Sequence, residues 1–171
     1  PPRSTLFPYT TLFRSTPVFK KFTISVSCPK VQTELQKKLV LCWFNGDNKP
    51  QPRGGEYNNG WIIAQVNQFG KYAIMLDTLA PQIKALNFTK GEDLTAKKSI
   101  RLKLSDDLSG ISKYEGLING NWVVFEWDPK NELVEYFFDE KAGIGPEYVL
   151  IFTASDNCGN KTRFERKYVR K

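Results

Sequence analysis

The chain contains no histidine among its 171 residues. Histidine is the commonest metal ligand and the commonest general base near neutral pH. Its absence excludes Ser-His-Asp and Cys-His nucleophile arrangements, zinc helices of the H-E-x-x-H type and other histidine-based hydrolytic zinc sites from this sequence. Phosphate loops of the forms G-x-G-x-x-G and G-x-x-x-x-G-K-[ST] are also absent. Carboxylates are therefore the only catalytic groups left to consider.

Long apolar runs and paired cysteines are lacking as well. No run approaches the roughly eighteen apolar residues of a membrane-spanning helix. Cys28, Cys42 and Cys158 form an odd set without C-x-x-C spacing, which suggests neither a zinc ribbon nor a disulfide framework. Cys28 and Cys42 fall in candidate neighbouring strands and could pair in an oxidising periplasm, but small buried thiols are the commoner outcome. We therefore predict no cofactor for this chain.

The first fifteen residues, PPRSTLFPYTTLFRS, show neither the alternation of a strand nor the spacing of an amphipathic helix. They do not form a secretory signal either, because Pro8, Thr10 and Thr11 interrupt the apolar core that such a signal needs. Back-translation of Thr5 to Ser15 resembles a widely used sequencing-adapter oligonucleotide. We expect residues 1–15 to be an artefact without a fold, and the sequence from Thr16 onward to be the tail of a longer protein.

What the sequence does contain favours strands. Aromatic residues make up 13% of the chain, and the only helical window, residues 31–38, is short. Phe22, Ile24 and Val26 alternate with polar residues, and Asn59-Gly60 separates two strand-like runs as a type I′ hairpin turn does. Residues 16–77 are therefore predicted to form an N-terminal β module.

Pro81 and the end of a strand near Leu76 place a boundary at about Asp77. Seven strand candidates follow, separated by turns rich in Gly, Asn, Asp and Pro: Ile83–Phe88, Ser99–Ser105, Ser112–Ile118, Asn121–Trp127, Leu133–Phe138, Tyr148–Ser155 and Arg163–Val169. Seven short strands in about ninety residues are typical of an immunoglobulin-like or fibronectin-like sandwich. The predicted fold class is all-β, with two small β modules of which the second, residues 78–171, is this seven-stranded sandwich.

Two of these strands lead to further expectations. Both faces of Asn121–Trp127 carry bulky side chains, which predicts a central strand partly covered by loops. The last eleven residues, KTRFERKYVRK, carry six basic groups against one acidic group. A strand with interleaved Phe164 and Tyr168 could contact nucleic acid or an anionic envelope polymer. We favour an amphipathic strand whose aromatic residues face inward and whose lysines guard an exposed edge.

Paired carboxylates occur where strands meet turns. They are Asp106 and Asp107, Glu126 and Asp128, Asp139 and Glu140, and the single Asp156. Nothing in the sequence indicates the cleft that a glycosidic acid/base pair needs, and Asp is favoured in turns because its side chain hydrogen-bonds the local backbone. Calcium is the more credible alternative, since loop oxygens from Asp106, Asp107, Asp156 and Asn157 could gather at one end of a sandwich. No EF-hand loop is present.

Three groups of residues along 16–171 are distinctive. They are a hinge (Phe69, Gly70, Tyr72, Asp77, Thr78, Pro81 and Ile83), a core (Asp107, Ser109, Gly110, Ile111, Tyr114, Gly116, Ile118, Gly120, Trp122, Val123, Glu126 and Asp128) and a turn (Asp156, Gly159 and Asn160). Together they resemble the C-terminal β-region attached to lysostaphin-type zinc metallopeptidases, the peptidoglycan-hydrolysing endopeptidases of certain Gram-negative bacteria.

The resemblance implies that a peptidase domain with H-x-x-x-D and H-x-H zinc elements lies upstream. Neither element is present here, so no catalytic residue is carried over. The resemblance implies an accessory region, exported to the periplasm or cell envelope, that positions a peptidase on its wall substrate or packs against it. The implied partners are the upstream peptidase domain and peptidoglycan or another envelope glycan, with no nucleic acid and no membrane span.

An alternative function is a freestanding glycan-binding module that uses Trp43, Trp61 or Trp122 as a platform for a sugar ring. A platform must be exposed, whereas a tryptophan after Asn-Gly in a hairpin, such as Trp61, is more often a core anchor. The sequence therefore favours buried tryptophans and leaves the sugar platform as the alternative.

Overall fold

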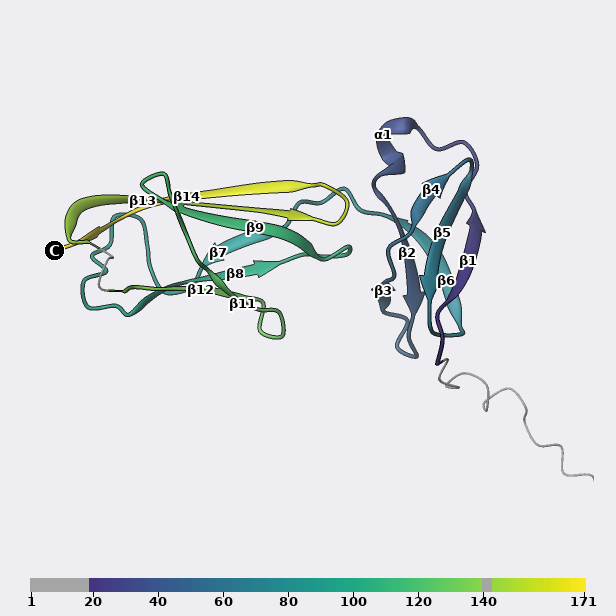
Figure 1. Ribbon diagram of the computed structural model, residues 1–171, viewed down its shortest axis with the longest axis horizontal. Coiled ribbons are helices and arrows are strands. Elements are labelled where there is room, and N and C mark those ends of the chain that lie inside the picture. Colours follow the sequence, from purple (N-terminus) through teal and green to yellow (C-terminus); the bar gives the residue numbers. More distant parts are fainter. Residues whose placement is uncertain (1–18, 140–142) are drawn as a thin grey trace, which may run out of the picture. The chain divides into compact units, whose positions relative to one another are not determined.

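The computed structural model describes residues 19–139 and 143–171, so the artefact expected at residues 1–15 lies outside the described part of the chain. Nearly all of its regular structure is β-strand, as predicted (Figure 1). The chain divides into two compact units, Pro1–Asp77 and Thr78–Lys171. Within the described residues the single helix is α1 (Thr33–Gln36), one turn inside the predicted helical window. No helix in this part is long and apolar enough to cross a membrane.

The first unit packs two three-stranded antiparallel sheets around one core. Its strands are β1 (Phe22–Ser27), β2 (Leu39–Phe44), β3 (Pro50–Pro52), β4 (Glu56–Asn58), β5 (Trp61–Val66) and β6 (Lys71–Leu76). One sheet has the order β1-β5-β4 and the other β3-β2-β6. Phe22, Ile24 and Val26 alternate inward as predicted, and pack on buried Leu41 and Ile62. Burial of these apolar faces stabilises the unit.

The Asn59-Gly60 turn joins β4 to β5. Both residues have positive φ, at 47° and 85°, and Asn58 pairs directly with Trp61 across the turn. A two-residue loop with two left-handed residues matches the twist of the flanking strands, which is why Asn-Gly is favoured there. The predicted hairpin is confirmed.

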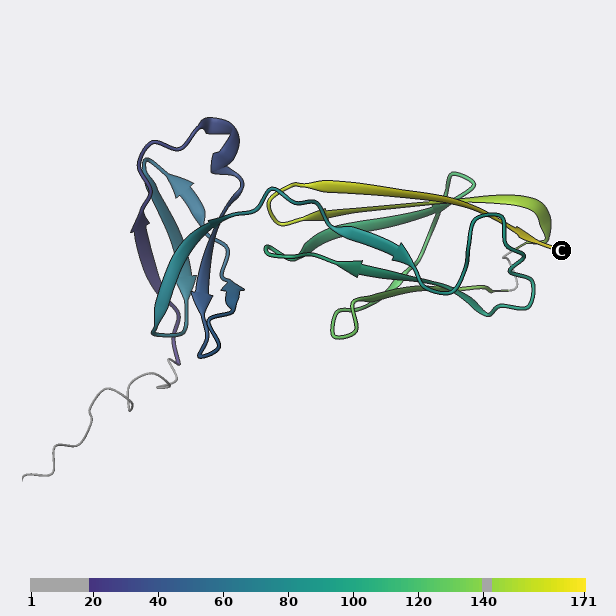
Figure 2. The same ribbon diagram turned by 180° about the vertical axis from the view of Figure 1, so that it is seen from behind.

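The second unit is a sandwich of two four-stranded sheets. Its strands are β7 (Gln82–Ala85), β8 (Ser99–Ser105), β9 (Ile111–Ile118), β10 (Asn121–Val123), β11 (Glu126–Asp128), β12 (Leu133–Phe137), β13 (Gly145–Asp156) and β14 (Lys161–Arg170). The sheets have the orders β10-β9-β13-β14 and β11-β12-β8-β7, and they lie as two layers in both ribbon views (Figures 1 and 2). These orders correspond to the ABED and C′CFG sheets of an immunoglobulin-like sandwich, which confirms the predicted fold class.

The structure corrects the prediction of one central strand at Asn121–Trp127. The segment forms two short strands instead, β10 at the edge of one sheet and β11 at the edge of the other. Only Phe125, at the crossover, is fully inside the core, whereas Trp122 and Val124 are exposed. The segment has bulky side chains on both faces because the chain crosses here from one sheet to the other. In the described residues the unit therefore has eight strands rather than the predicted seven.

The core of the second unit is built from aliphatic and aromatic side chains of both sheets. Leu102, Val134, Leu150 and Phe152 are fully buried, and Phe164 packs against this core while Tyr168 lies within it. The inward orientation predicted for the two aromatic residues of the last strand is thus confirmed. Each buried aliphatic or aromatic side chain contributes roughly 1.5–3 kcal/mol.

A loop covers the outer edge of β14. The backbone N–H of Gly91 donates to Lys167 O, Leu94 N–H donates to Val169 O, and Val169 N–H donates to Glu92 O. These bonds occupy part of the edge that an unpaired strand would offer to another chain. The basic residues of β14 are also engaged, since Lys167 pairs with Glu147 at 2.8 Å.

Candidate functional site

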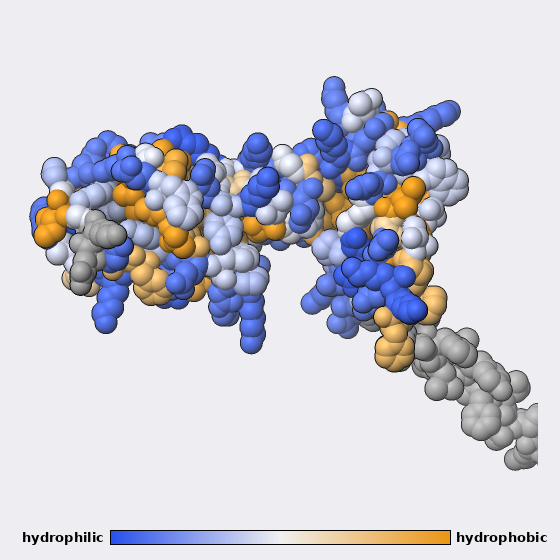
Figure 3. Space-filling view, viewed as in Figure 1, coloured by the Kyte–Doolittle hydropathy of each residue, from blue (hydrophilic) through white to orange (hydrophobic). Residues whose placement is uncertain are grey.

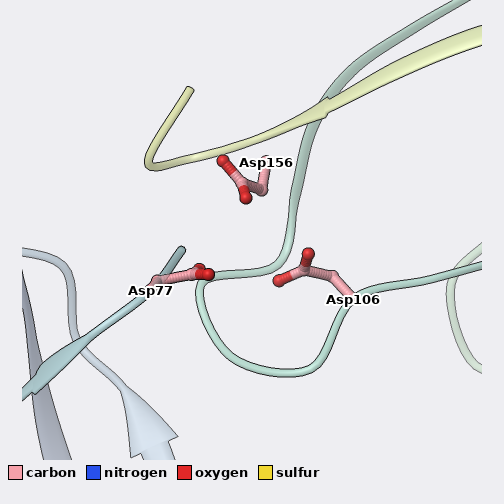
Figure 4. Close-up of side chains that lie close together, drawn as sticks. All are labelled: Asp77, Asp106 and Asp156. Atoms are coloured by element: carbon pink, nitrogen blue, oxygen red, sulfur yellow. The ribbon is translucent and has the colours of Figure 1, made fainter. Parts of the chain in front are cut away.

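Three carboxylates come together at one end of the second unit. Asp106 follows β8, Asp156 ends β13, and Asp77 is the residue at which the first unit ends. Their carboxylate oxygens lie within 4.8 Å of one another, and the three side chains point toward a common centre (Figure 4). Asp77 and Asp156 are almost completely buried. This cluster is the densest group of possible metal ligands among the described residues.

Each of the two turns in the second unit is shaped by its own aspartate. Asp156 Oδ1 accepts the backbone N–H groups of Cys158 and Asn160, both at 2.8 Å, and Oδ2 accepts the Asn160 amide at 2.6 Å. Asp106 Oδ2 accepts the N–H groups of Leu108 at 3.2 Å and Gly110 at 2.7 Å. An aspartate that hydrogen-bonds the backbone two to four residues ahead stabilises a turn. The turn role predicted for these residues is therefore confirmed.

The other two calcium candidates have different positions. Asn157 clamps the two turns together, because its amide nitrogen donates to Ser109 O at 2.7 Å and to Gly110 O at 3.1 Å. Asp107 is exposed and lies outside the carboxylate cluster. The sequence groups Asp107 with the distinctive core residues, but the turn is shaped by Asp106. The sequence did not identify Asp77 as a candidate ligand, because no neighbouring residue indicates that its side chain lies near the turns of Asp106 and Asp156.

The cluster is electrostatically costly when all three groups are ionised. Two unit charges 4.8 Å apart repel by about 3 kcal/mol at an effective dielectric constant near 20. The turn hydrogen bonds donated to Asp106 and Asp156 offset part of this repulsion. A divalent cation would remove the rest, and carboxylate oxygens are the ligands that Ca²⁺ prefers.

The remaining acidic candidates form no such cluster in the described residues. Asp128 shapes its own turn, where the Asn131 amide donates to Oδ2 at 2.6 Å and is the largest cause of the lowered pKa of Asp128. Glu126 and Asp139 are exposed, and Glu140 lies outside the described residues. Among the described residues, these acidic candidates therefore either stabilise a turn or lie at the surface.

Trp43 is not available as a flat platform. The Arg53 guanidinium lies over its ring at 5.3 Å, and its Nε1–H donates to Phe69 O at 3.3 Å. Gly70 also lies against the ring, since a Cβ there would be 2.7 Å from Nε1. Cation–π contact and close packing thus hold this side chain within the first unit.

Trp61 and Trp122 are exposed, with 47% and 64% of their surface accessible. The expectation that Trp61 anchors the core is wrong, because the inward face of β5 carries Ile62, Ala64 and Val66. Gln65 shares the outward face with Trp61, and this polar neighbour is the signal that distinguishes the two faces. The exposure that a sugar platform requires is therefore met by two of the three candidate tryptophans.

Two of the surface grooves on the second unit differ in charge. One, of about 430 Å³, is lined by Trp122, Val123, Val124, Glu126, Tyr136, Phe137 and Asp139. The other, of about 550 Å³, lies on the face of β9, β13 and β14 and includes Lys113, Lys161 and Arg163. In the space-filling view apolar side chains reach the surface of both units among polar ones (Figure 3).

Comparison with protein families gives one match in the first unit. The model of the Zu5-like domain matches residues 7–77, which is less than half of the chain and includes part of the segment expected to be an artefact. A comparison with curated proteins finds no match.

Two solved structures are distantly similar. CopC from Methylosinus trichosporium OB3b has a TM-score of 0.40 and 14% identity, covering 53% of this chain and 94% of its own. The fibronectin(III)-like modules of Clostridium thermocellum CbhA have a TM-score of 0.41 and 15% identity, covering 87% of this chain and 85% of theirs. Neither similarity identifies a ligand or a partner for this chain.

Proposed function

We propose that this chain is a non-catalytic accessory region of an exported cell-wall metallopeptidase, and that it positions the enzyme by binding the wall. The exposure of Trp61 and Trp122 is the observation that carries the binding role, because large aromatic side chains left at the surface mark sites of interaction. The hinge, core and turn residues that resemble the lysostaphin-type accessory region support the peptidase parent and the periplasmic or envelope location.

The distribution of acidic residues supports a role without catalysis. A chain without histidine lacks the commonest general base, and its turn carboxylates are the acid/base candidates that the sequence singles out. In the described residues, Asp106, Asp128 and Asp156 accept hydrogen bonds within their turns, which accounts for their positions without a catalytic role.

The upstream reading frame tests the proposed parent. We expect the contiguous gene to encode a domain with H-x-x-x-D and H-x-H zinc ligands before Thr16. An upstream region with no such ligands would contradict the peptidase parent and favour the alternative, a freestanding glycan-binding module of the cell envelope. The binding role itself would be tested separately.

As a second role, we propose that Asp106 and Asp156 bind Ca²⁺ together with the junction residue Asp77. The three carboxylates within 4.8 Å favour this role. A bound cation would stabilise the turns at this end of the second unit, since a ligand that binds only the folded state raises its stability.

Calcium titration of the melting temperature tests this second role. We expect Ca²⁺ to raise the melting temperature and EDTA to reverse the change. Asp106→Asn should abolish most of the shift, whereas Asp107→Asn, which changes an exposed neighbour outside the cluster, should retain it. A melting temperature that is insensitive to both Ca²⁺ and EDTA would rule out the site.

A further inference from the structure

The groove beside Trp122 combines exposed apolar side chains with acidic ones. Trp122, Val124 and Phe137 are 64%, 60% and 51% accessible, and all three line the groove. Glu126 and Asp139 line it as well and are its only charged residues within the part of the chain that the structure describes. Its volume of about 430 Å³ lies within the range of about 300–1,000 Å³ that is usual for small-molecule sites. This combination is a candidate ligand site that differs from the carboxylate cluster.

The position of Trp122 is fixed by the crossover between the two sheets. Phe125 is buried and its ring packs edge-on against Phe152, with 4.9 Å between the centroids. Gly116 leaves the space for that ring, because a Cβ at this position would lie 2.5 Å from Phe125 Cδ2. Extended backbone alternates its side chains, so anchoring Phe125 inward turns Trp122 and Val124 outward together. The aromatic surface is therefore held in place by the core.

Glu126 adds an acceptor beside this surface. Its side chain is exposed, and within the described residues the carboxylate forms no hydrogen bond or ion pair. Its partner across the β11–β12 ladder is Glu135, another acid, so the pairing gives it no counter-charge. A carboxylate of this kind is free to accept hydrogen bonds from hydroxyl groups, and such charge-assisted bonds are among the stronger ones.

From these contacts we infer that the groove binds an uncharged glycan, an inference that rests on the proposed binding role. One pyranose ring packs its apolar C–H face on Trp122, with Val124 and Phe137 extending the apolar floor. Sugar hydroxyl groups donate to the Glu126 carboxylate at the rim. The sugar thus covers the tryptophan surface while its remaining hydroxyl groups stay in water.

Charge selects the kind of glycan. The two carboxylates repel anionic polymers and phosphate-rich surfaces, whereas a neutral or N-acetylated sugar chain carries no charge to oppose them. The groove on β9, β13 and β14 shows the contrast, because its lining holds three basic residues against one acidic residue, Glu115. A polyanion would bind the basic groove, whereas a neutral glycan would bind the Trp122 groove. The charge of the bound glycan therefore distinguishes the two grooves.

Binding of soluble oligosaccharides to the whole chain tests the inference. Chitotetraose, cellotetraose and maltotetraose serve as neutral probes, and polygalacturonate serves as the anionic probe, with calorimetry and tryptophan fluorescence as readouts. We expect at least one neutral probe to bind and to protect fluorescence from acrylamide. Trp122→Ala should lower that affinity by about tenfold or more, while Trp122→Phe retains part of it. The matched control is Leu86→Ala, which shortens an exposed apolar side chain of the same unit outside the groove and should leave the affinity unchanged.

The outcomes separate this inference from the proposed function. If no neutral probe binds at millimolar concentration, or if Leu86→Ala and Trp122→Ala weaken binding equally, the groove is not the site. Retention on insoluble peptidoglycan without binding of soluble probes would overturn the groove and leave the wall-binding role intact. Binding of a neutral probe without retention of the chain on peptidoglycan would support the groove and contradict the wall-binding role. If Trp122→Ala does not fold, Trp122→Phe replaces it. The inference then requires that the probe protects wild-type fluorescence from acrylamide and protects that of Trp122→Phe less; equal protection would overturn it.

Discussion

Gly116 shows how one residue controls both the core and the Trp122 groove. A methyl group at this position would overlap the buried Phe125 ring and would lie 3.5 Å from Phe152. We expect Gly116→Ala to lower the free energy of unfolding by about 1–3 kcal/mol, which is the usual cost of overpacking a core. Chemical denaturation followed by fluorescence measures this change.

The control for this substitution is Gly46→Ala. An added Cβ at Gly46 meets no atom within 4 Å. Its effect should remain within about 0.5 kcal/mol. Equal effects of the two substitutions would mean that Phe125 does not fill the space beside Gly116 as the structure shows.

Single residues also mark the limit of what the sequence could predict. The sequence correctly assigned Asp106 and Asp156 to turns, because Asp side chains bond the backbone within a few residues. Asp77 was missed as a possible ligand because it meets the other two only through the fold. Trp61 was predicted to face the core because it follows the Asn59-Gly60 turn. This was wrong, and Gln65 on the same face of β5 indicates the outward side.

At the scale of elements, the strand pattern was predictable and the crossover was not. Ser99–Ser105 was predicted with its final bounds, since strict alternation of apolar and polar residues identifies a half-buried strand. Residues 121–127 gave no such signal, because apolar residues occupy both faces. The division into β10 and β11 depends on which sheet each half joins, and this is decided by pairing with β9 and β12.

The loop that covers the edge of β14 should respond to pH through Glu92. The pKa of Glu92 is lowered from 4.5 to about 2, chiefly by the hydrogen bond from the Lys97 ammonium and then by the two hydrogen bonds from Thr89. Because the folded pKa is the lower one, this contribution is fully present above pH 4.5 and is lost as the pH falls toward 2.

We therefore expect melting temperatures of the wild type to fall more steeply between pH 4.5 and 2 than those of Glu92→Gln. Amide exchange at Leu94 and Val169 should increase over the same range, because their hydrogen bonds join the loop to β14. Parallel pH profiles of the two proteins would show that Glu92 does not hold the loop.

At the scale of the whole molecule, each unit has its own core. The buried residues of the second core run from Phe88 to Tyr168, and those of the first run from Leu41 to Val66. We expect a fragment of residues 78–171 to unfold cooperatively by itself, because none of its core contacts needs the first unit. Near-ultraviolet circular dichroism during denaturation measures this. A fragment that lacks fixed aromatic packing would contradict it.

In the proposed function, the chain binds the cell wall and performs no chemistry on it. Sedimentation of the intact chain with purified insoluble peptidoglycan tests both parts in one experiment, if the pellet is assayed for bound protein and the supernatant for released muropeptides. We expect protein in the pellet and no released fragments. Protein that stays in the supernatant, or muropeptides that appear with time, would contradict it.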